Sequence, residues 1–127
     1  MKNETKKNKI LVCDDDRAIN HALELKLNHE GFEVITALNG NECLDAMTRE
    51  NFDLLLLDLV LPQKDGFAVL EELKNLGNKV PIIVVSNLGQ QEDIERVKHL
   101  GVTDYLIKSN TSIAVMVEKI KKILIKK

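Results

Sequence analysis

Short apolar runs alternate along this chain with stretches in which apolar residues recur at helical spacing. The runs cover residues 10–13, 33–37, 54–57, 80–85 and 104–107, lengths that favour β-strands. Between them, apolar residues three and four positions apart predict helices. The glycines that end three of these helices are Gly31, Gly77 and Gly101. A further helix starts at Asn39-Gly40, and Thr111 or Ser112 can cap the last one. The pattern therefore predicts five β-α units.

The third run, Leu54 to Leu57, consists of four consecutive leucines. Because successive side chains of a strand point to opposite faces, this strand is apolar on both faces and must be covered on both. Five such units with short links predict an α/β fold, a doubly wound parallel sheet with helices above and below. In the strand order 2-1-3-4-5, strands one and three are neighbours, and the residues that follow them meet at one edge of the sheet.

Length and composition agree with one domain. The chain has 127 residues, 44% of them hydrophobic, which is enough for one core. Residues 1–8 are polar and without periodicity, so we expect a mobile tail before a domain at 9–127. The formal net charge of -2 implies neither nucleic acid nor a membrane as a partner, and no apolar run is long enough to span a bilayer. We expect a cytoplasmic protein with Cys13 and Cys43 as buried, reduced thiols.

The polar residues that directly follow the predicted strands carry the candidate chemistry. They are Asp14 and Asp15 after strand one, Asp58 after strand three, Ser86 after strand four and Lys108 after strand five. Several carboxylates in one crevice repel one another unless a cation neutralises them. Oxygen ligands without histidine or cysteine favour Mg²⁺, which keeps several waters and completes its octahedron with phosphate oxygens. An ammonium and a hydroxyl can hold a phosphoryl group carried on one of the aspartates.

These residues allow a second kind of site. Asp14, Asp15 and Asp16 contain an Asp-x-Asp spacing after a strand, as in an Mg²⁺-dependent phosphohydrolase with Asp14 as nucleophile and Asp16 as acid and base. The sequence lacks a distal acidic pair for that reading and has no room for a substrate cap. The blander interpretation of Asp16 is a helix N-cap, since carboxylates are favoured at that end of a helix.

Over residues 9 to 125 the sequence resembles the receiver domains of two-component response regulators, which have a flavodoxin-like fold. The motifs that carry the resemblance are Ile10-Leu11-Val12-Cys13-Asp14-Asp15-Asp16, Leu57-Asp58-Leu59-Val60-Leu61-Pro62, Asp65-Gly66, Ser86, and Asp104-Tyr105-Leu106-Ile107-Lys108. Each motif is weak alone, but five in this order and spacing are specific.

The resemblance implies that Asp58 accepts a phosphoryl group from a histidine kinase or a phosphotransfer protein. It also implies that Asp15 and Asp58 bind Mg²⁺ directly, that Asp14 binds it through water, and that the Val60 carbonyl is a further ligand. Lys108 would pair with the phosphoryl oxygens. The protein would then be a signalling phosphoacceptor and not an enzyme, catalysing only its own phosphoryl transfer and slow dephosphorylation.

Ser86 and Tyr105 correspond to the switch pair of the family. The resemblance implies that phosphorylation remodels the surface of helix four, strand five and helix five, where a downstream protein binds. We expect a monomer or a phosphorylation-dependent dimer. The chain could be a single-domain regulator or a receiver cut from a longer protein, and a degenerate receiver that acts only as a binding module is a further alternative.

Two positions depart from the usual pattern. Ser109 stands where most receivers have proline, which argues against the cis peptide bond that usually follows the lysine, because a non-proline cis bond costs about 2.5–4 kcal/mol. Asn87 replaces a small residue, and we expect its amide to crowd the phosphoryl pocket or to donate a hydrogen bond to it. Val60 and Leu88 flank the expected path of hydrolytic water. Neither can orient that water, so we expect a long-lived phosphoryl group.

Overall fold

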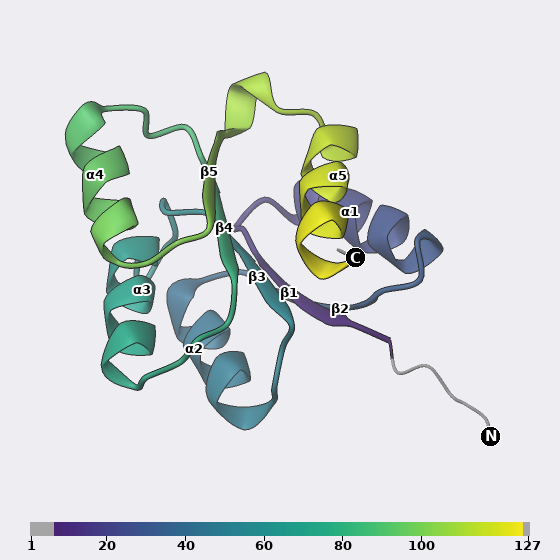
Figure 1. The fold of residues 1–127 in the computed structure, drawn as a ribbon, viewed down its shortest axis with the longest axis horizontal. Coiled ribbons are helices and arrows are strands. Elements are labelled where there is room, and N and C mark those ends of the chain that lie inside the picture. The colour runs from purple at the N-terminus through teal and green to yellow at the C-terminus, as the bar shows by residue number, and fades with distance from the viewer. Residues whose placement is uncertain (1–6, 126–127) are drawn as a thin grey trace.

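The structure, a computed structural model, describes residues 7–125 as one parallel sheet with helices on both faces (Figure 1). The strands are β1 (Lys9–Cys13), β2 (Glu33–Ala37), β3 (Leu54–Leu57), β4 (Ile82–Ser86) and β5 (Asp104–Ile107). The helices are α1 (Arg17–His29), α2 (Gly40–Arg49), α3 (Gly66–Asn75), α4 (Gln91–His99) and α5 (Ile113–Leu124), with a 3₁₀ turn at Lys108–Asn110. The strand order is β2-β1-β3-β4-β5, which confirms the predicted fold class and order.

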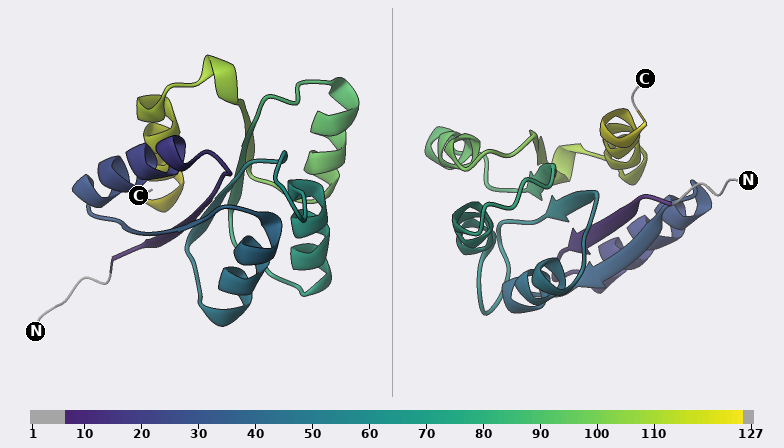
Figure 2. Two further views of the ribbon diagram at one scale, coloured as in Figure 1. Left: turned by 180° about the vertical axis from the view of Figure 1, so that it is seen from behind. Right: turned by 60° about the horizontal axis from the view of Figure 1, so that its bottom comes forward.

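The leucine run divides the core into two layers. Leu55 and Leu57 belong to a cluster that contains the buried residues of α2, α3 and α4. Leu54 and Leu56 belong to a second cluster, with the buried residues of α1 and α5. Figure 2 shows the same division, with α1 and α5 together on one face of the sheet. All four leucines are buried because both faces of β3 are covered, as the sequence predicted.

The ends of the elements follow the predicted signals, with one shift. Gly31, Gly77 and Gly101 have positive φ angles just beyond α1, α3 and α4, the conformation that glycine adopts most readily. The strand predicted at residues 80–85 is β4, Ile82–Ser86. It starts later because Pro81 has no N–H to donate to a neighbouring strand. It ends one residue later because Ser86 still pairs with Ile107 of β5.

Four of the five α-helices are capped by side chains at their N-termini, and α4 is not. The carboxylates of Asp16 and Asp65, the amide of Asn39 and the hydroxyl of Ser112 accept backbone N–H groups from the first turns of α1, α3, α2 and α5, respectively. Such a cap is typically worth about 0.5–2 kcal/mol. Of the two caps predicted for the last helix, Ser112 serves; Thr111 instead donates its hydroxyl to the Ile107 carbonyl.

The remaining predictions concern the thiols and the N-terminal segment. Cys13 and Cys43 are free and buried, as expected, and burial raises the pKa of the Cys13 thiol. The predicted tail at residues 1–8 falls mostly on residues 1–6, which lie outside the described residues. Asn8 extends the pairing of β1 with β2 by one residue, since its carbonyl accepts the Glu33 N–H at 2.9 Å. Within residues 7–125, none of the helices is both long and apolar enough to span a bilayer.

Candidate functional site

Three strands bring the predicted site residues together at their carboxyl ends. Asp14 follows β1 and Asp58 follows β3, and the two strands are hydrogen-bonded neighbours. The backbone continues this pairing beyond the strands, because the Asp58 N–H donates to the Cys13 carbonyl at 2.9 Å. Lys108 follows β5, and its Nζ reaches across β4 to within 2.8 Å of Oδ2 of both Asp14 and Asp58.

Local turns fix the direction of the two buried carboxylates. Oδ1 of Asp14 accepts the Asp16 N–H at 2.9 Å, and Oδ1 of Asp58 accepts the Val60 N–H at 3.1 Å. Each carboxylate therefore has one oxygen committed to its own loop, a common arrangement for aspartate in turns. The other oxygen of each, Oδ2, faces Lys108.

Gly66 lets the next helix begin close to the Asp58 loop. A Cβ at this position would lie 2.6 Å from the Leu59 Cα and 2.7 Å from the Asp58 carbonyl oxygen. The Gly66 N–H donates to the Leu59 carbonyl at 2.8 Å, and Asp65 caps the helix beside it. Any larger residue would push α3 away, so the Asp65-Gly66 motif acts on the site through the backbone that carries Asp58.

The buried part of the site holds two carboxylates and only one ammonium group. Asp14 and Asp58 are both 5% exposed. Burial raises the pKa of the Asp14 carboxyl, and the Asp58 charge adds to this, although Lys108 and the Asp16 N–H act in the opposite direction. Burial also lowers the pKa of Lys108, but its hydrogen bonds to the two carboxylates and their charges outweigh burial, and the net pKa is raised. One ammonium thus serves two buried carboxylates.

The third aspartate completes a set of oxygen ligands. Asp15 is exposed, and one carboxylate oxygen from each of Asp14, Asp15 and Asp58 lies within 4.8 Å of the others. Three carboxylates and one ammonium leave an excess negative charge, while burial, with the Asp58 charge as a smaller contribution, raises the pKa of Asp14. A hard divalent cation with oxygen preference fits this donor set.

The two predicted switch residues are linked through one residue of the loop after β4. Ser86 is fully buried, and its hydroxyl accepts the Leu88 N–H at 3.3 Å. The Tyr105 hydroxyl donates to the Leu88 carbonyl. Burial raises the pKa of Tyr105, and the charge of Asp93 on α4 adds to the effect. A movement of Ser86 or of Tyr105 therefore acts on the same peptide segment.

Asn87 makes a contact that the sequence did not predict. Its Oδ1 accepts the Ser109 N–H at 2.8 Å, so the amide oxygen ties the loop after β4 to the 3₁₀ turn after Lys108. A proline at position 109 would have no N–H for this bond. The two departures from the family pattern are therefore physically connected. All peptide bonds of residues 7–125 are trans, including the one between Lys108 and Ser109.

Asp16 has the role of the blander interpretation. Its Oδ1 accepts the N–H groups of Ala18 and Ile19 at 2.9 and 3.3 Å and caps α1. A carboxylate held this way faces the helix and is poorly placed as the acid and base of a phosphohydrolase.

Of the residues expected to set the phosphoryl lifetime, Val60 is 56% exposed, whereas Leu88 is half-buried against the core.

One residue of the site was missed by the sequence analysis. Asn20 is 4% exposed on the inner face of α1, and its Nδ2 donates to the Asp14 carbonyl at 2.8 Å. The sequence signal is a polar residue three and seven positions before the buried Leu23 and Leu27, which places it on the buried stripe of the helix.

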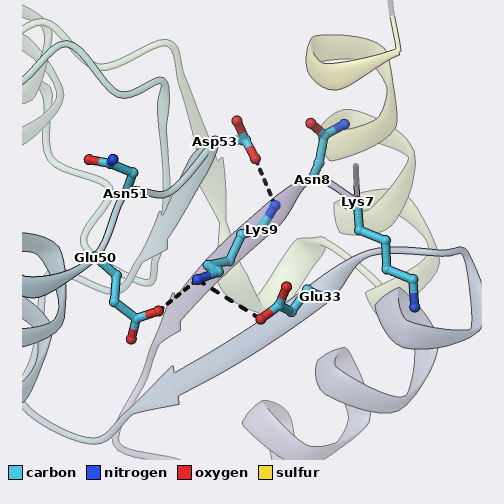
Figure 3. Close-up of a pocket in the computed structure, with 7 residues that line it drawn as sticks. All are labelled: Lys7, Asn8, Lys9, Glu33, Glu50, Asn51 and Asp53. Carbon is cyan, nitrogen blue, oxygen red and sulfur yellow. Dashed lines mark hydrogen bonds and ion pairs between the residues drawn. The ribbon is translucent and has the colours of Figure 1, made fainter. Parts of the chain in front are cut away.

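The opposite edge of the sheet carries a second charged group. A hollow of about 650 Å³ at the amino ends of the strands is lined by Lys9, Glu33, Glu50 and Asp53, among others (Figure 3). The Lys9 Nζ lies 2.7 Å from Glu50 and 3.9 Å from Glu33, and the Lys9 backbone N–H donates to Asp53 at 2.7 Å. The carboxylates here already have partners and are open to solvent.

Comparison with known proteins agrees with the resemblance to the receiver domains of response regulators. A family model described as "Response regulator receiver domain" matches residues 10–121. The chain is 41% identical over 105 residues to a "Probable transcriptional regulator ycf27" of Porphyra purpurea, covering 83% of this chain and 43% of the relative. A protein of the same name from Cyanophora paradoxa is 39% identical over 105 residues. The chain thus spans less than half the length of these relatives.

Solved structures with this fold include two that are at least 30% identical to this chain. The Francisella response regulator 1452 receiver domain superimposes with a TM-score of 0.84 at 30% identity, over 92% of this chain and 96% of that one. A CheY-like response regulator receiver domain protein from Methanospirillum hungatei JF-1 gives 0.86 at 31% identity, over 92% and 93% of the two chains.

Proposed function

Because this chain belongs to the family of receiver domains of two-component response regulators, we propose that it accepts a phosphoryl group on Asp58. The donor is a histidine kinase or a phosphotransfer protein. The observation that supports this proposal most directly is Lys108, whose Nζ lies 2.8 Å from both Asp14 and Asp58 beside a third carboxylate.

The chemistry is a transfer between a phosphohistidine and a carboxylate. An Asp58 oxygen forms a bond to phosphorus as the P–N bond of the donor breaks, and the electron pair returns to the imidazole nitrogen, which takes up a proton. Asp14, Asp15, Asp58 and the Val60 carbonyl would hold Mg²⁺, which supplies positive charge to the phosphoryl oxygens. Lys108 turns from the carboxylates to a phosphoryl oxygen and adds a second positive charge. The protein then acts as a phosphoacceptor and not as an enzyme with an external substrate.

The acceptor can be tested with a small donor. The protein is incubated with Mg²⁺ and acetyl phosphate, and the added mass and its acid lability are measured. Asp58→Asn should remove the phosphorylation and keep the fold, whereas Asp53→Asn, at the other end of the sheet, should be phosphorylated like the wild type. Label on Asp14 in the Asp58→Asn variant would instead support the phosphohydrolase alternative.

Phosphorylation would be transmitted through the loop after β4. A dianionic phosphoryl group draws the Ser86 hydroxyl toward it, which ends its bond to the Leu88 N–H. Tyr105 shares the Leu88 peptide segment and shifts with it. The surface of α4, β5 and α5 changes as a result, and there a hollow of about 410 Å³ is lined by Ile94, Tyr105 and Ile107, among others. A downstream protein or a second phosphorylated copy binds this surface.

Ser86→Ala separates the two steps. This variant should be phosphorylated but should not gain affinity for the partner, because the hydroxyl that responds to the phosphoryl group is absent. Partner affinity is compared with and without beryllofluoride, which mimics the phosphoryl group. Equal affinity of the two wild-type forms would rule out the switch.

We further propose that the phosphoryl group is long-lived. Val60 and Leu88 add apolar cover and cannot orient an attacking water, and losing such orientation typically slows a reaction by about 10-fold to 100-fold. The bond from Ser109 to Asn87 ties the loop after β4 to the turn after Lys108 and so restrains the segment that carries Leu88. Such persistence suits a slow relay or a transcription-scale response, in keeping with relatives that are named probable transcriptional regulators.

The lifetime is measured by loading the protein, removing the donor and following the loss of phosphate. The double variant Val60→Asn, Leu88→Glu should lose phosphate about 10-fold to 100-fold faster. Asn87→Ala tests the contribution of the loop contact separately. Decay of the wild type within seconds, or no acceleration in the double variant, would contradict the proposal.

A further inference from the structure

Asn20 is the one polar side chain on the buried stripe of α1. It lies in the second turn of the helix and is 4% exposed, on the same face as Leu23 and Leu27. Both of these leucines pack in the core cluster between α1, α5 and the sheet. An amide at such a position needs hydrogen-bond partners, because a buried polar group without them lowers stability.

The Asn20 amide nitrogen joins three elements. It donates to the Asp14 carbonyl at 2.8 Å and approaches the Ala37 carbonyl at 3.4 Å. The Asp14 N–H donates to the same Ala37 carbonyl at 3.2 Å. The carboxyl ends of β1 and β2 are therefore tied to α1 at the residue that begins the acidic site.

The carbonyl that Asn20 holds belongs to the peptide between Asp14 and Asp15. The orientation of this planar peptide sets the directions in which both side chains leave the backbone. One oxygen from each of these two carboxylates and from Asp58 lies within 4.8 Å of the others, so a tilt of that peptide would move two of the three. Asn20 thus acts on two metal-ligand candidates at once, although it contacts neither carboxylate.

The other atom of the amide has no partner. Oδ1 of Asn20 is the only buried side-chain nitrogen or oxygen of residues 7–125 without a hydrogen bond. An unpaired buried acceptor is a cost to stability that an apolar side chain of similar size would avoid. The amide nevertheless supplies a donor to the Asp14 carbonyl, which an apolar side chain could not do.

We propose that Asn20 is a positioning residue of the acidic site, which fixes the Asp14-Asp15 peptide so that the three carboxylates converge on one divalent cation. This inference rests on the proposed function, since it concerns the same Mg²⁺ site. Groups that orient metal ligands typically contribute 10-fold to 100-fold in metal affinity. Asn20 should do so without touching the metal, the donor or the phosphoryl group.

The test is Mg²⁺ binding, measured by calorimetry on the unphosphorylated full chain, together with urea unfolding in a chelator. Asn20→Leu keeps the volume and removes the donor, and Asn20→Ala avoids any clash if the leucine variant does not fold. Both should bind Mg²⁺ about 10-fold to 100-fold more weakly than the wild type. Leu23→Ala is the matched control, on the same face of α1 and equally buried. It should lower stability and leave Mg²⁺ affinity within about twofold.

The outcomes separate this inference from the proposed function. Wild-type affinity in both Asn20 variants would overturn the positioning role and leave the metal site standing. An equal loss of affinity in Leu23→Ala would also overturn it, because the effect would then follow general destabilisation. A wild type that binds no Mg²⁺ would overturn both the metal site and the role of Asn20.

Discussion

Both ends of the sheet carry lysine among carboxylates, but in different surroundings. At the carboxyl end, Lys108 lies among Asp14, Asp15 and Asp58. At the amino end, Lys9 lies among Glu33, Glu50 and Asp53 (Figure 3). Each end thus has three carboxylates around a lysine, and Lys7 is a second lysine that lines the amino end, so the types of charged group alone do not distinguish the two ends.

Burial distinguishes them. The side chains of Asp14 and Asp58 are each 6% exposed, whereas those of Glu33 and Glu50 are 53% and 39% exposed. At the amino end water solvates the charges, and such pairs are typically worth about 0–1 kcal/mol. At the carboxyl end water is largely excluded, so uncompensated charge must be met by a cation or by a raised pKa. Similar groups therefore form solvated ion pairs at one end and the candidate site at the other.

The two ends should differ most in how the loss of their lysine changes the rate of phosphorylation. Lys108→Ala removes a cation that lies 2.8 Å from the proposed acceptor, and removal of one such stabilising group typically costs 10²–10³-fold in rate. Lys9→Ala should leave the rate within about twofold, because Lys9 is at the opposite edge of the sheet. The rate of mass gain with acetyl phosphate and saturating Mg²⁺ is measured for both. Similar losses in the two variants would mean that the comparison is wrong.

A divalent cation should stabilise the folded protein only by binding at the carboxyl end of the sheet. At a Mg²⁺ concentration of 100 times its dissociation constant, the folded state should gain about 2.7 kcal/mol, since the unfolded chain has no assembled site. Asp15→Asn should lose most of this gain, and Glu50→Gln should keep it. Urea unfolding with Mg²⁺ and with a chelator gives the difference. A similar gain in the Asp15→Asn variant would place the cation elsewhere.

The sequence was sufficient for the fold and for the residues at the carboxyl end because both follow from the position along the strands. Apolar runs fix the strands, and parallel strands bring the residues after them to one edge. Asp14, Asp58 and Lys108 meet there for that reason. The cluster of Lys9, Glu33, Glu50 and Asp53 at the amino end was not predicted. Two of its residues begin strands, and the other two lie in the loop before β3.

Contacts of side chains with distant backbone could not be predicted in this way. Asn20 holds a carbonyl six residues earlier, and Asn87 accepts an N–H 22 residues later. The second contact depends on the path of the 3₁₀ turn after β5, which no apolar period specifies. The contact of the Asn87 oxygen with Ser109 was therefore not predicted, and the expected effect of the Asn87 amide on the phosphoryl pocket stays a prediction.

When no divalent cation is present, removing a carboxylate should raise the free energy of unfolding at the carboxyl end and lower it at the amino end. Asp14→Asn relieves a buried charge whose pKa is raised by burial, so it should stabilise by about 0.5–2 kcal/mol, as relief of active-site cost often does. Asp53→Asn weakens the acceptor of the Lys9 N–H and should destabilise by about 0.5 kcal/mol. Urea midpoints in a chelator measure both. Destabilisation by Asp14→Asn would show that Lys108 fully compensates the buried carboxylates.

The smallest effect is expected from the pH dependence of the Lys9 pair. The hydrogen bond to Glu50 raises the pKa of Lys9, against the effect of desolvation, with the charges of Glu50, Glu33 and Asp53 adding to it. A raised pKa in the folded state means that the contribution is complete below the unfolded value of about 10.4 and is lost as pH rises through the folded value. The stability gap between wild type and Lys9→Met should therefore be small and constant from about pH 7 to 9, shrink only above about pH 10.4, and fall with added salt. A gap that changes between about pH 7 and 9 would mean that Lys9 interacts with a group that titrates there, and the amino end would then be more than an exposed ion pair.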